Sequence, residues 1–282
     1  MDPSCLDYRL TDEEQREFDE RGFLIVKQAL PADLVEALVA AVDRVDAIYR
    51  SKMELGSNDK LNLLDFIGKD DIFLELLDWP KTFPKVWGIL GWHIQLYHSH
   101  LIVTPPLGAG EEIPKRLFWH QDSGRINLDL ESDPRPRVSL KIGFFLTDVS
   151  TPDRGNFHVI PGSHLSNRLE LPEDENLDHP DVTPVCVSAG DAVFFDRRLW
   201  HSAGNNLSDV TRKVFFYGYS YRWLKPRDNM TVAHYMERSD LVRRQLLGAS
   251  PTGGFGFTSP SEEDVPLKAW IREHVGEEAL VR

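Results

Sequence analysis

The stretch GDAVFFDRRLWHSAGNNLSDVTR, residues 190–212, decides the fold of this chain. The turn Ala189-Gly190-Asp191 leads into the apolar run AVFF, whose length and composition are typical of a buried strand. His201 lies just beyond that strand, and Arg212 directly precedes the next β-rich run, KVFFYGYSYRW. The stretch therefore predicts neighbouring strands of a buried sheet with polar side chains at their ends.

Short β-rich runs continue on both sides of this stretch, roughly from residue 93 to residue 223. They are IQLYHSHLIV, KRLFWHQD, VSLKIGFFL, FHVI and PVCV, separated by turn sequences such as PPLGAG, PDRG and PGS. Many short strands with Gly, Pro and Asp punctuation favour a β-sandwich or jelly roll. No alternation of strands with helices is visible, so a doubly wound parallel sheet is not expected.

The flanking regions show helical patterns. Thr11 and Glu14 fit a capping box, Gly22 ends that helix, and FLIV at 23–26 reads as a buried strand. An amphipathic helix is expected to begin near Pro31–Asp33, and a further helical region spans roughly 70–90. We predict one domain over 1–282, with mostly helical support at 1–92, a jelly-roll core at 93–223 and a helical tail at 224–282.

Composition excludes several classes of protein. The chain has 282 residues, 41% of them hydrophobic, and a net charge of −13, which argues against nucleic acid or an anionic membrane as partner. No apolar run reaches the ~18–20 residues of a membrane span. Cys5 and Cys186 show neither metal-binding nor redox spacing, and no export signal is visible, so we expect a cytoplasmic protein. The oligomeric state stays open.

Three residues suggest a metal site. His120 and Asp122 are two apart on an expected strand, so their side chains point to the same face. An HxD pair is weak evidence alone, but His201 follows about 80 residues later, just beyond another strand. Two histidines and one carboxylate form the facial triad of non-haem iron(II) oxygenases, which leaves positions open for a co-substrate and O2.

Arg212, eleven residues after His201, suggests the co-substrate. A guanidinium directed into a barrel is costly unless an anion meets it. The distal carboxylate of 2-oxoglutarate would meet it as a bidentate partner, while the keto-acid end chelates iron. The alternative is an internal salt bridge to one of the many carboxylates of the chain.

In combination these motifs resemble the phytanoyl-CoA dioxygenase family. The resemblance rests on WHQD (119–122), TPDRGNFHVIPGSH (151–164) and residues 190–212, and it extends weakly over most of the chain. It implies a double-stranded β-helix (jelly-roll, cupin-like) core within a mainly β fold with α-helical support. It also implies Fe(II), with 2-oxoglutarate and O2 as co-substrates.

The resemblance also assigns individual residues. It places His120, Asp122 and His201 at the catalytic metal and Arg212 at the co-substrate, and it places His100 in contact with 2-oxoglutarate. Two positions depart from the family pattern. Ala203 stands where a small hydroxyl residue is often seen, with Ser202 one residue earlier as the co-substrate contact. Gly143 stands where a bulky or polar residue is usual, and Lys141 or Thr147 would then help to line the pocket.

Other residues are candidates for substrate contact. Strand alternation puts Phe216 on the same face as Arg212, so it is a pocket candidate, although a core role is an equal alternative. Tyr97 is also a pocket candidate, and Arg125 at the mouth could meet an anionic substrate or form a surface ion pair. A further alternative makes His98 and His100 a second metal pair of cupin type, although no glutamate follows at the usual distance.

The activity predicted is hydroxylation of an unactivated C–H bond in a small hydrophobic or lipid-like metabolite of natural-product or secondary metabolism. Asp122 distinguishes the site from related halogenases, where a small residue makes room for chloride. Desaturation, epoxidation or rearrangement by the same chemistry, or a non-catalytic jelly-roll binding protein, are the alternatives. A CoA thioester would need clustered basic side chains, and only scattered ones are found: Lys115, Arg116, Arg135 and Arg137.

Overall fold

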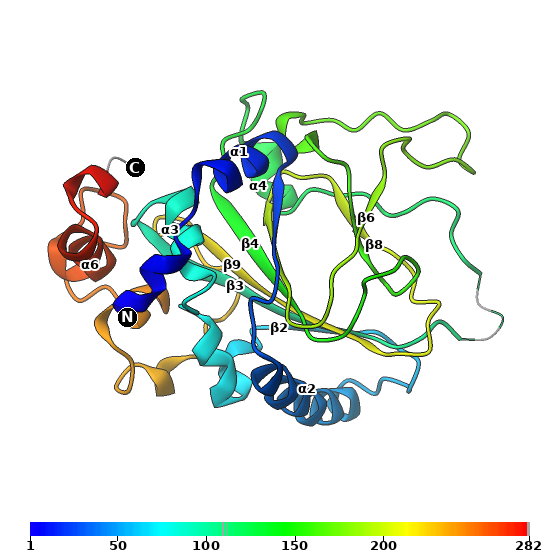
Figure 1. Ribbon diagram of the computed structural model, residues 1–282, viewed down its shortest axis with the longest axis horizontal. Coiled ribbons are helices and arrows are strands. Elements are labelled where there is room, and N and C mark those ends of the chain that lie inside the picture. Colours follow the sequence, from blue (N-terminus) through cyan, green and yellow to red (C-terminus); the bar gives the residue numbers. More distant parts are fainter. Residues whose placement is uncertain (109, 111, 281–282) are drawn as a thin grey trace.

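The computed structural model describes residues 1–108, 110 and 112–280, and its core consists of two antiparallel β-sheets (Figure 1). The larger sheet has the strand order β1 (Phe23–Val26), β7 (Ala192–Asp196), β4 (Ser139–Phe145), β9 (Arg212–Tyr221), β3 (Ile94–Thr104) and β2 (Leu61–Leu64). The smaller sheet has the order β6 (Thr183–Val185), β5 (Phe157–Val159) and β8 (His201–Ala203). The mainly β, jelly-roll prediction is confirmed.

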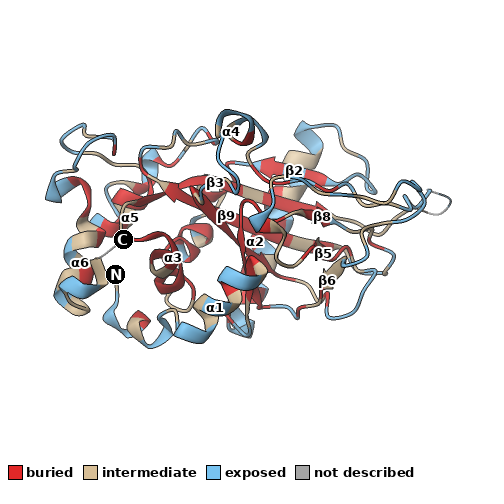
Figure 2. Cartoon of the chain, turned by 90° about the horizontal axis from the view of Figure 1, so that it is seen from above, coloured by how far each residue is buried: buried red, intermediate tan, exposed pale blue. Residues whose placement is uncertain are grey.

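Helices support the larger sheet at its ends and on one face. They are α1 (Asp12–Arg21), α2 (Ala32–Lys52), α3 (Phe83–Leu90), α4 (Gly124–Asp129), α5 (Leu241–Leu246) and α6 (Pro266–His274). Short 3₁₀ helices lie at Pro3–Tyr8, Ile67–Lys69, Asp71–Leu76, Ser163–Leu165, Ala233–Tyr235, Glu262–Asp264 and Glu277–Leu280. Figure 2 shows that burial concentrates in the strands and in the helix faces turned toward them.

The predicted ends of the first helix are confirmed. Thr11 and Glu14 form a reciprocal capping box at its start. Gly22 ends it in the left-handed conformation, with φ of 79°, which a residue lacking Cβ adopts without strain.

The two faces of β9 contact different cores. Tyr217 and Phe215 belong to the cluster shared with the helices, and the Tyr217 hydroxyl donates to the Phe73 carbonyl oxygen at 2.6 Å. Val214 and Phe216 belong to the second cluster, between the sheets. Alternate residues of one strand therefore separate the helix-packed face of the sheet from its inner face, as the sequence pattern predicts.

The structure corrects two expectations about strands. β2 (Leu61–Leu64) was not expected, and it joins β1 in giving the larger sheet two strands from the N-terminal part. The run KRLFWHQD is not a strand, because only His120 forms a bridge there, to His201. The residues just before His120 bond to a loop instead: the Leu117 amide and the Trp119 indole both donate to the Asp178 carboxylate.

The division of the domain into helical support, jelly-roll core and helical tail, with boundaries near residues 92 and 223, remains a prediction.

Among the residues that the structure describes, no helix has both the length and the apolar character needed to cross a membrane.

Candidate metal and co-substrate site

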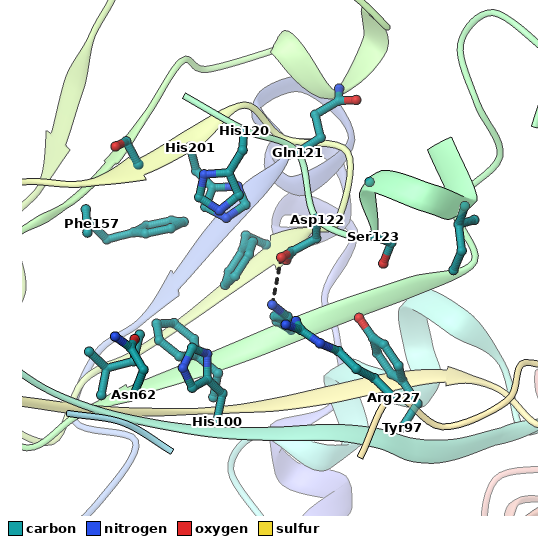
Figure 3. A pocket seen from close by; sticks show the side chains of 18 of the residues that line it. Asn62, Tyr97, His100, His120, Gln121, Asp122, Ser123, Phe157, His201 and Arg227 are labelled. Carbon is teal, nitrogen blue, oxygen red and sulfur yellow. Dashed lines mark hydrogen bonds and ion pairs between the residues drawn. The ribbon is translucent and has the colours of Figure 1, made fainter. Parts of the chain in front are cut away.

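A cavity of about 600 Å³ opens between the inner faces of the sheets, and nine of the predicted site residues line it, as does Lys141, whereas Thr147 does not (Figure 3). The three proposed metal ligands, the three proposed co-substrate contacts and the three substrate candidates all appear in its wall: His120, Asp122, His201, Arg212, His100, Ser202, Arg125, Tyr97 and Phe216. The sheets thus bring together residues that are more than a hundred positions apart in the chain.

His120, Asp122 and His201 converge at this cavity, and one ligand atom from each lies within 4.8 Å of the others. His201 is the first residue of β8, and the bridge between His120 and His201 brings the loop of His120 against it. The Asp122 amide donates to the Arg197 carbonyl oxygen at 2.9 Å, which fixes the loop two residues further on. Within the described chain this is the one group of three or more such side chains close enough to hold one ion.

The hydrogen bonds of these residues suit metal binding. Nδ1 of His201 lies 2.8 Å from the Leu199 carbonyl oxygen, so a proton on that nitrogen leaves Nε2 as a lone-pair donor. Oδ1 of Asp122 accepts from the Lys141 ammonium at 2.8 Å, whereas its buried Oδ2 has no partner. A buried carboxylate oxygen without a partner is costly, and a divalent cation would satisfy it.

The charge states also suit metal binding. Burial by itself raises the pKa of Asp122, but the Lys141 ammonium and the neighbouring histidines outweigh it and hold the pKa well below its usual range. Burial lowers the pKa of His201 to about 4. Both groups are therefore deprotonated near neutral pH, as metal ligands must be.

Arg212, at the start of β9, has no ion-pair partner among the residues that the structure describes. It is 2% exposed, and its Nε and Nη1 atoms have no hydrogen-bond partner. Burial lowers its pKa to about 10, so the guanidinium is charged at neutral pH. No carboxylate in the described part of the chain lies within ion-pair distance of it, so none of these residues forms the internal salt bridge that was the alternative. A buried, charged guanidinium at the cavity wall suits the binding of an anionic small molecule.

The departure at Gly143 has a steric reason. Gly143 on β4 is paired in register with Phe216 on β9. A Cβ at position 143 would lie 2.7 Å from a ring carbon of Phe216, so a larger residue would displace the ring. In this chain the Phe216 ring takes the space that a bulky residue on β4 would use.

The HxH pair does not form a second metal site. Nδ1 of the buried His98 is 2.8 Å from the Asp228 carboxylate, and His98 does not line the cavity. His100 does line it, with an unpartnered Nε2. The described residues offer no third ligand to this pair.

His100 makes the stability of the metal-free protein pH-dependent. Burial lowers its pKa from 6.5 to about 3, so between these values the unfolded chain binds a proton that the folded chain excludes. Above pH 6.5 the buried neutral His100 costs the folded protein no stability. As pH falls below 6.5, the free energy of unfolding decreases by about 1.4 kcal/mol per pH unit. We expect the free energy of unfolding, measured with urea, to fall by about 2 kcal/mol more in the wild type than in His100→Asn between about pH 7 and 5. Parallel pH profiles of the two proteins would contradict this.

The substrate candidates differ in their surroundings. Tyr97 and Phe216 are buried in the cavity wall. Arg125, on α4, is exposed at the mouth and pairs with Asp129 at 2.6 Å, which is the surface ion pair foreseen as its alternative.

Three cations in the wall, Lys60, Lys225 and Arg227, were not predicted. They lie in loops after residue 52 and after β9, where no periodic pattern indicates which way a side chain points.

The family model for phytanoyl-CoA dioxygenase (PhyH) matches residues 18–214 of the chain. The chain belongs to the phytanoyl-CoA dioxygenase family. It is therefore an iron(II)- and 2-oxoglutarate-dependent dioxygenase, as the sequence motifs predicted. The match includes the loop of His120 and Asp122, the strand of His201 and the position of Arg212.

Curated relatives are remote. The chain is 24% identical to an ectoine dioxygenase of Bordetella bronchiseptica over an alignment of 241 positions that covers 75% of each protein. It is 22% identical to the peroxisomal phytanoyl-CoA dioxygenase of Mus musculus, over 73% of this chain and 67% of that protein. The dioxygenase andF of Emericella variicolor is 29% identical over 133 residues, 46% of this chain and less than half (43%) of that protein.

Solved structures share the fold. HygX from Streptomyces hygroscopicus, crystallised with nickel and 2-oxoglutarate, superposes with a TM-score of 0.63 at 19% identity, over 77% of this chain and 90% of that one. The 2-oxoglutarate-dependent carbocyclase SnoK from nogalamycin biosynthesis superposes with a TM-score of 0.58 at 23% identity, over 82% and 91%.

Proposed function

We propose that His120, Asp122 and His201 hold the iron(II) of this dioxygenase and that Arg212 binds the distal carboxylate of 2-oxoglutarate. The observation that carries this assignment is a buried, unpaired guanidinium in the same cavity as three converging ligand side chains. The cavity wall thus offers both the cation and the anion site that the co-substrate needs.

The residues around the triad hold it in place. The Lys141 ammonium orients the Asp122 carboxylate through Oδ1 and leaves Oδ2 for the metal. The Leu199 carbonyl oxygen orients His201, and His100 with Ser202 completes the co-substrate wall. Iron with 2-oxoglutarate and O2 supplies the oxidant, while the protein positions the substrate carbon and excludes water.

The substrate we propose is a small hydrophobic or lipid-like metabolite of secondary metabolism, oxidised at an unactivated C–H bond. A cavity of about 600 Å³ falls in the size range of small-molecule sites and has room for such a compound beside 2-oxoglutarate. Tyr97, Phe216 and Leu224 supply apolar wall.

The four scattered basic residues noted in the sequence, Lys115, Arg116, Arg135 and Arg137, give no support to a CoA thioester as substrate. The Arg137 guanidinium pairs with Asp196 and Asp19, and Arg116 donates to loop carbonyl oxygens. Lys115 and Arg135 likewise donate to protein groups, and none of the four lines the cavity.

The proposed location is the cytoplasm. Cys5 and Cys186 are both free thiols, which suits a reducing compartment.

The test is oxygen-dependent succinate formation from 2-oxoglutarate by the iron-loaded protein, with a substrate panel scored by product mass. Hydroxylation adds one oxygen atom to the product, and this atom comes from ¹⁸O2. Desaturation removes two hydrogens instead, and rearrangement leaves the mass unchanged or lower. A non-catalytic binding protein, the second candidate, would bind iron and form no succinate.

A further inference from the structure

The cavity is cationic although the chain as a whole is acidic. The net charge of the protein is −13, yet six basic side chains and one carboxylate, Asp122, line the cavity. The basic side chains are Lys60, Arg125, Lys141, Arg212, Lys225 and Arg227. Such a concentration of one charge in a concave site favours a ligand of the opposite charge.

Four of these cations are accounted for. Lys141 pairs with Asp122, and Arg125 pairs with Asp129. Arg212 is assigned to 2-oxoglutarate, and Lys60 lies close enough to Arg212 for the two charges to repel each other. The distal carboxylate of 2-oxoglutarate would relieve that repulsion.

Arg227 and Lys225 remain. Both are exposed to the cavity, and among the described residues neither has a carboxylate within ion-pair distance. Figure 3 shows the Arg227 side chain extending into the cavity beside Tyr97 and toward Asp122. The charges of Arg227 and Lys141 both act on His100, so two cations face the same space.

The backbone holds Arg227 in this position. Its amide donates to the Tyr97 carbonyl oxygen at 2.8 Å. The carboxylate of the next residue, Asp228, accepts from the Ser99 amide and lies 2.8 Å from Nδ1 of His98. These bonds hold the backbone of the segment after β9 across β3, so the exposed side chain of Arg227 starts from a fixed point at the cavity wall.

Arg227 and Arg212 are attached at separate points along β3. Arg212 is paired in register with Thr104 of β3, whereas the Arg227 amide is bonded to Tyr97 of the same strand. At about 3.3 Å per residue, the two backbone attachment points are roughly 23 Å apart along β3. We therefore assign the two arginines to separate anions, Arg212 to 2-oxoglutarate and Arg227 to a second one.

We propose that the substrate is an organic oxyanion, a carboxylate or a phosphate monoester, whose charged group binds Arg227 with help from Lys225. Its apolar body then lies along Tyr97, Leu224 and Ile126, which line the same cavity. This inference rests on the proposed function, because it assigns Arg212 and the triad to the co-substrate and the metal.

The test uses enzyme loaded with Fe(II) and 2-oxoglutarate. A panel of straight-chain carboxylic acids of graded length is compared with the methyl esters and the alkyl phosphates of matching length. Binding is measured by calorimetry without oxygen, and substrate-stimulated succinate formation is measured with oxygen. We expect the acids or the phosphates to bind and stimulate, and the neutral esters to do neither; which of the two anions is preferred distinguishes carboxylate from phosphate.

Variants then test whether Arg227 and Lys225 bind the anion. Arg227→Met should weaken binding of the preferred anion by about 30- to 100-fold, and Lys225→Met by about threefold to tenfold. The co-substrate KM should change by less than about twofold in Arg227→Met, and Arg227→Lys should recover part of the anion affinity. Arg16→Met, which removes an exposed arginine on α1, is the matched control.

Equal binding of esters and anions across the panel, or an unchanged anion affinity in Arg227→Met, overturns the inference. A rise in the co-substrate KM alone also overturns it, since Arg227 would then bind 2-oxoglutarate. If the proposed function itself fails, the result is different. The wild type would then form no succinate, with or without an added candidate substrate, and would not bind iron at the triad.

Discussion

The His201→Ala variant is expected to lose iron-dependent succinate formation by about a thousandfold or more, because it removes one of three protein ligands from a metal site. The loss should appear in metal binding as well as in turnover. Calorimetric titration of the metal-free protein with Mn(II), which occupies such sites without turnover, should show binding in the wild type and none in the variant.

His234→Ala is the matched control for that loss. His234 is exposed in the 3₁₀ helix Ala233–Tyr235 and does not line the cavity. It should keep wild-type metal binding and turnover. Wild-type activity in His201→Ala would show that the metal is held elsewhere, and the assignment of the triad would fall with it.

Arg212→Met is expected to have opposite effects on co-substrate binding and on stability. Losing a bidentate charged partner should raise the co-substrate KM by about 100-fold or more. The metal-free variant should nevertheless be more stable than the wild type by about 1–3 kcal/mol, because it no longer buries an unpaired guanidinium. Succinate formation at graded 2-oxoglutarate concentrations measures the first effect, and thermal unfolding of the metal-free proteins measures the second.

The unfolding experiment also checks the binding role. With Mn(II) present in both samples, a 2-oxoglutarate concentration that saturates the wild type should raise the melting temperature of the wild type and leave that of Arg212→Met nearly unchanged. Arg212→Lys keeps the charge without the planar fork, so its co-substrate KM should lie between the two. A variant that is less stable and binds 2-oxoglutarate normally would mean that Arg212 has a partner within the protein.

Local sequence patterns predicted most of the fold. The alternation in KVFFYGYSYRW is enough to separate Phe216 and Arg212 on one face from Phe215 and Tyr217 on the other, because side chains alternate across a strand. The capping box at Thr11 and the glycine at position 22 act through their immediate neighbours, so they too can be read without the tertiary structure.

Patterns that depend on distant partners were predicted less well. The segment around His120 has the composition of a strand, yet it forms one bridge, since the Leu117 amide and the Trp119 indole bond to Asp178 in a loop. β2 was missed because LNLL is short, and it is a strand only through its pairing with β3.

The sequence by itself determined the chemistry of this protein: two histidines, a carboxylate and an arginine, at spacings that a jelly roll brings to one cavity. Only the tertiary structure decided which charges are compensated. It pairs Lys141 with Asp122 and Arg125 with Asp129, and it places no carboxylate of the described residues within ion-pair distance of Arg212 or Arg227. The reason is physical: a residue's identity and spacing determine what it can bind, whereas its actual partner depends on which distant side chains the fold brings within reach.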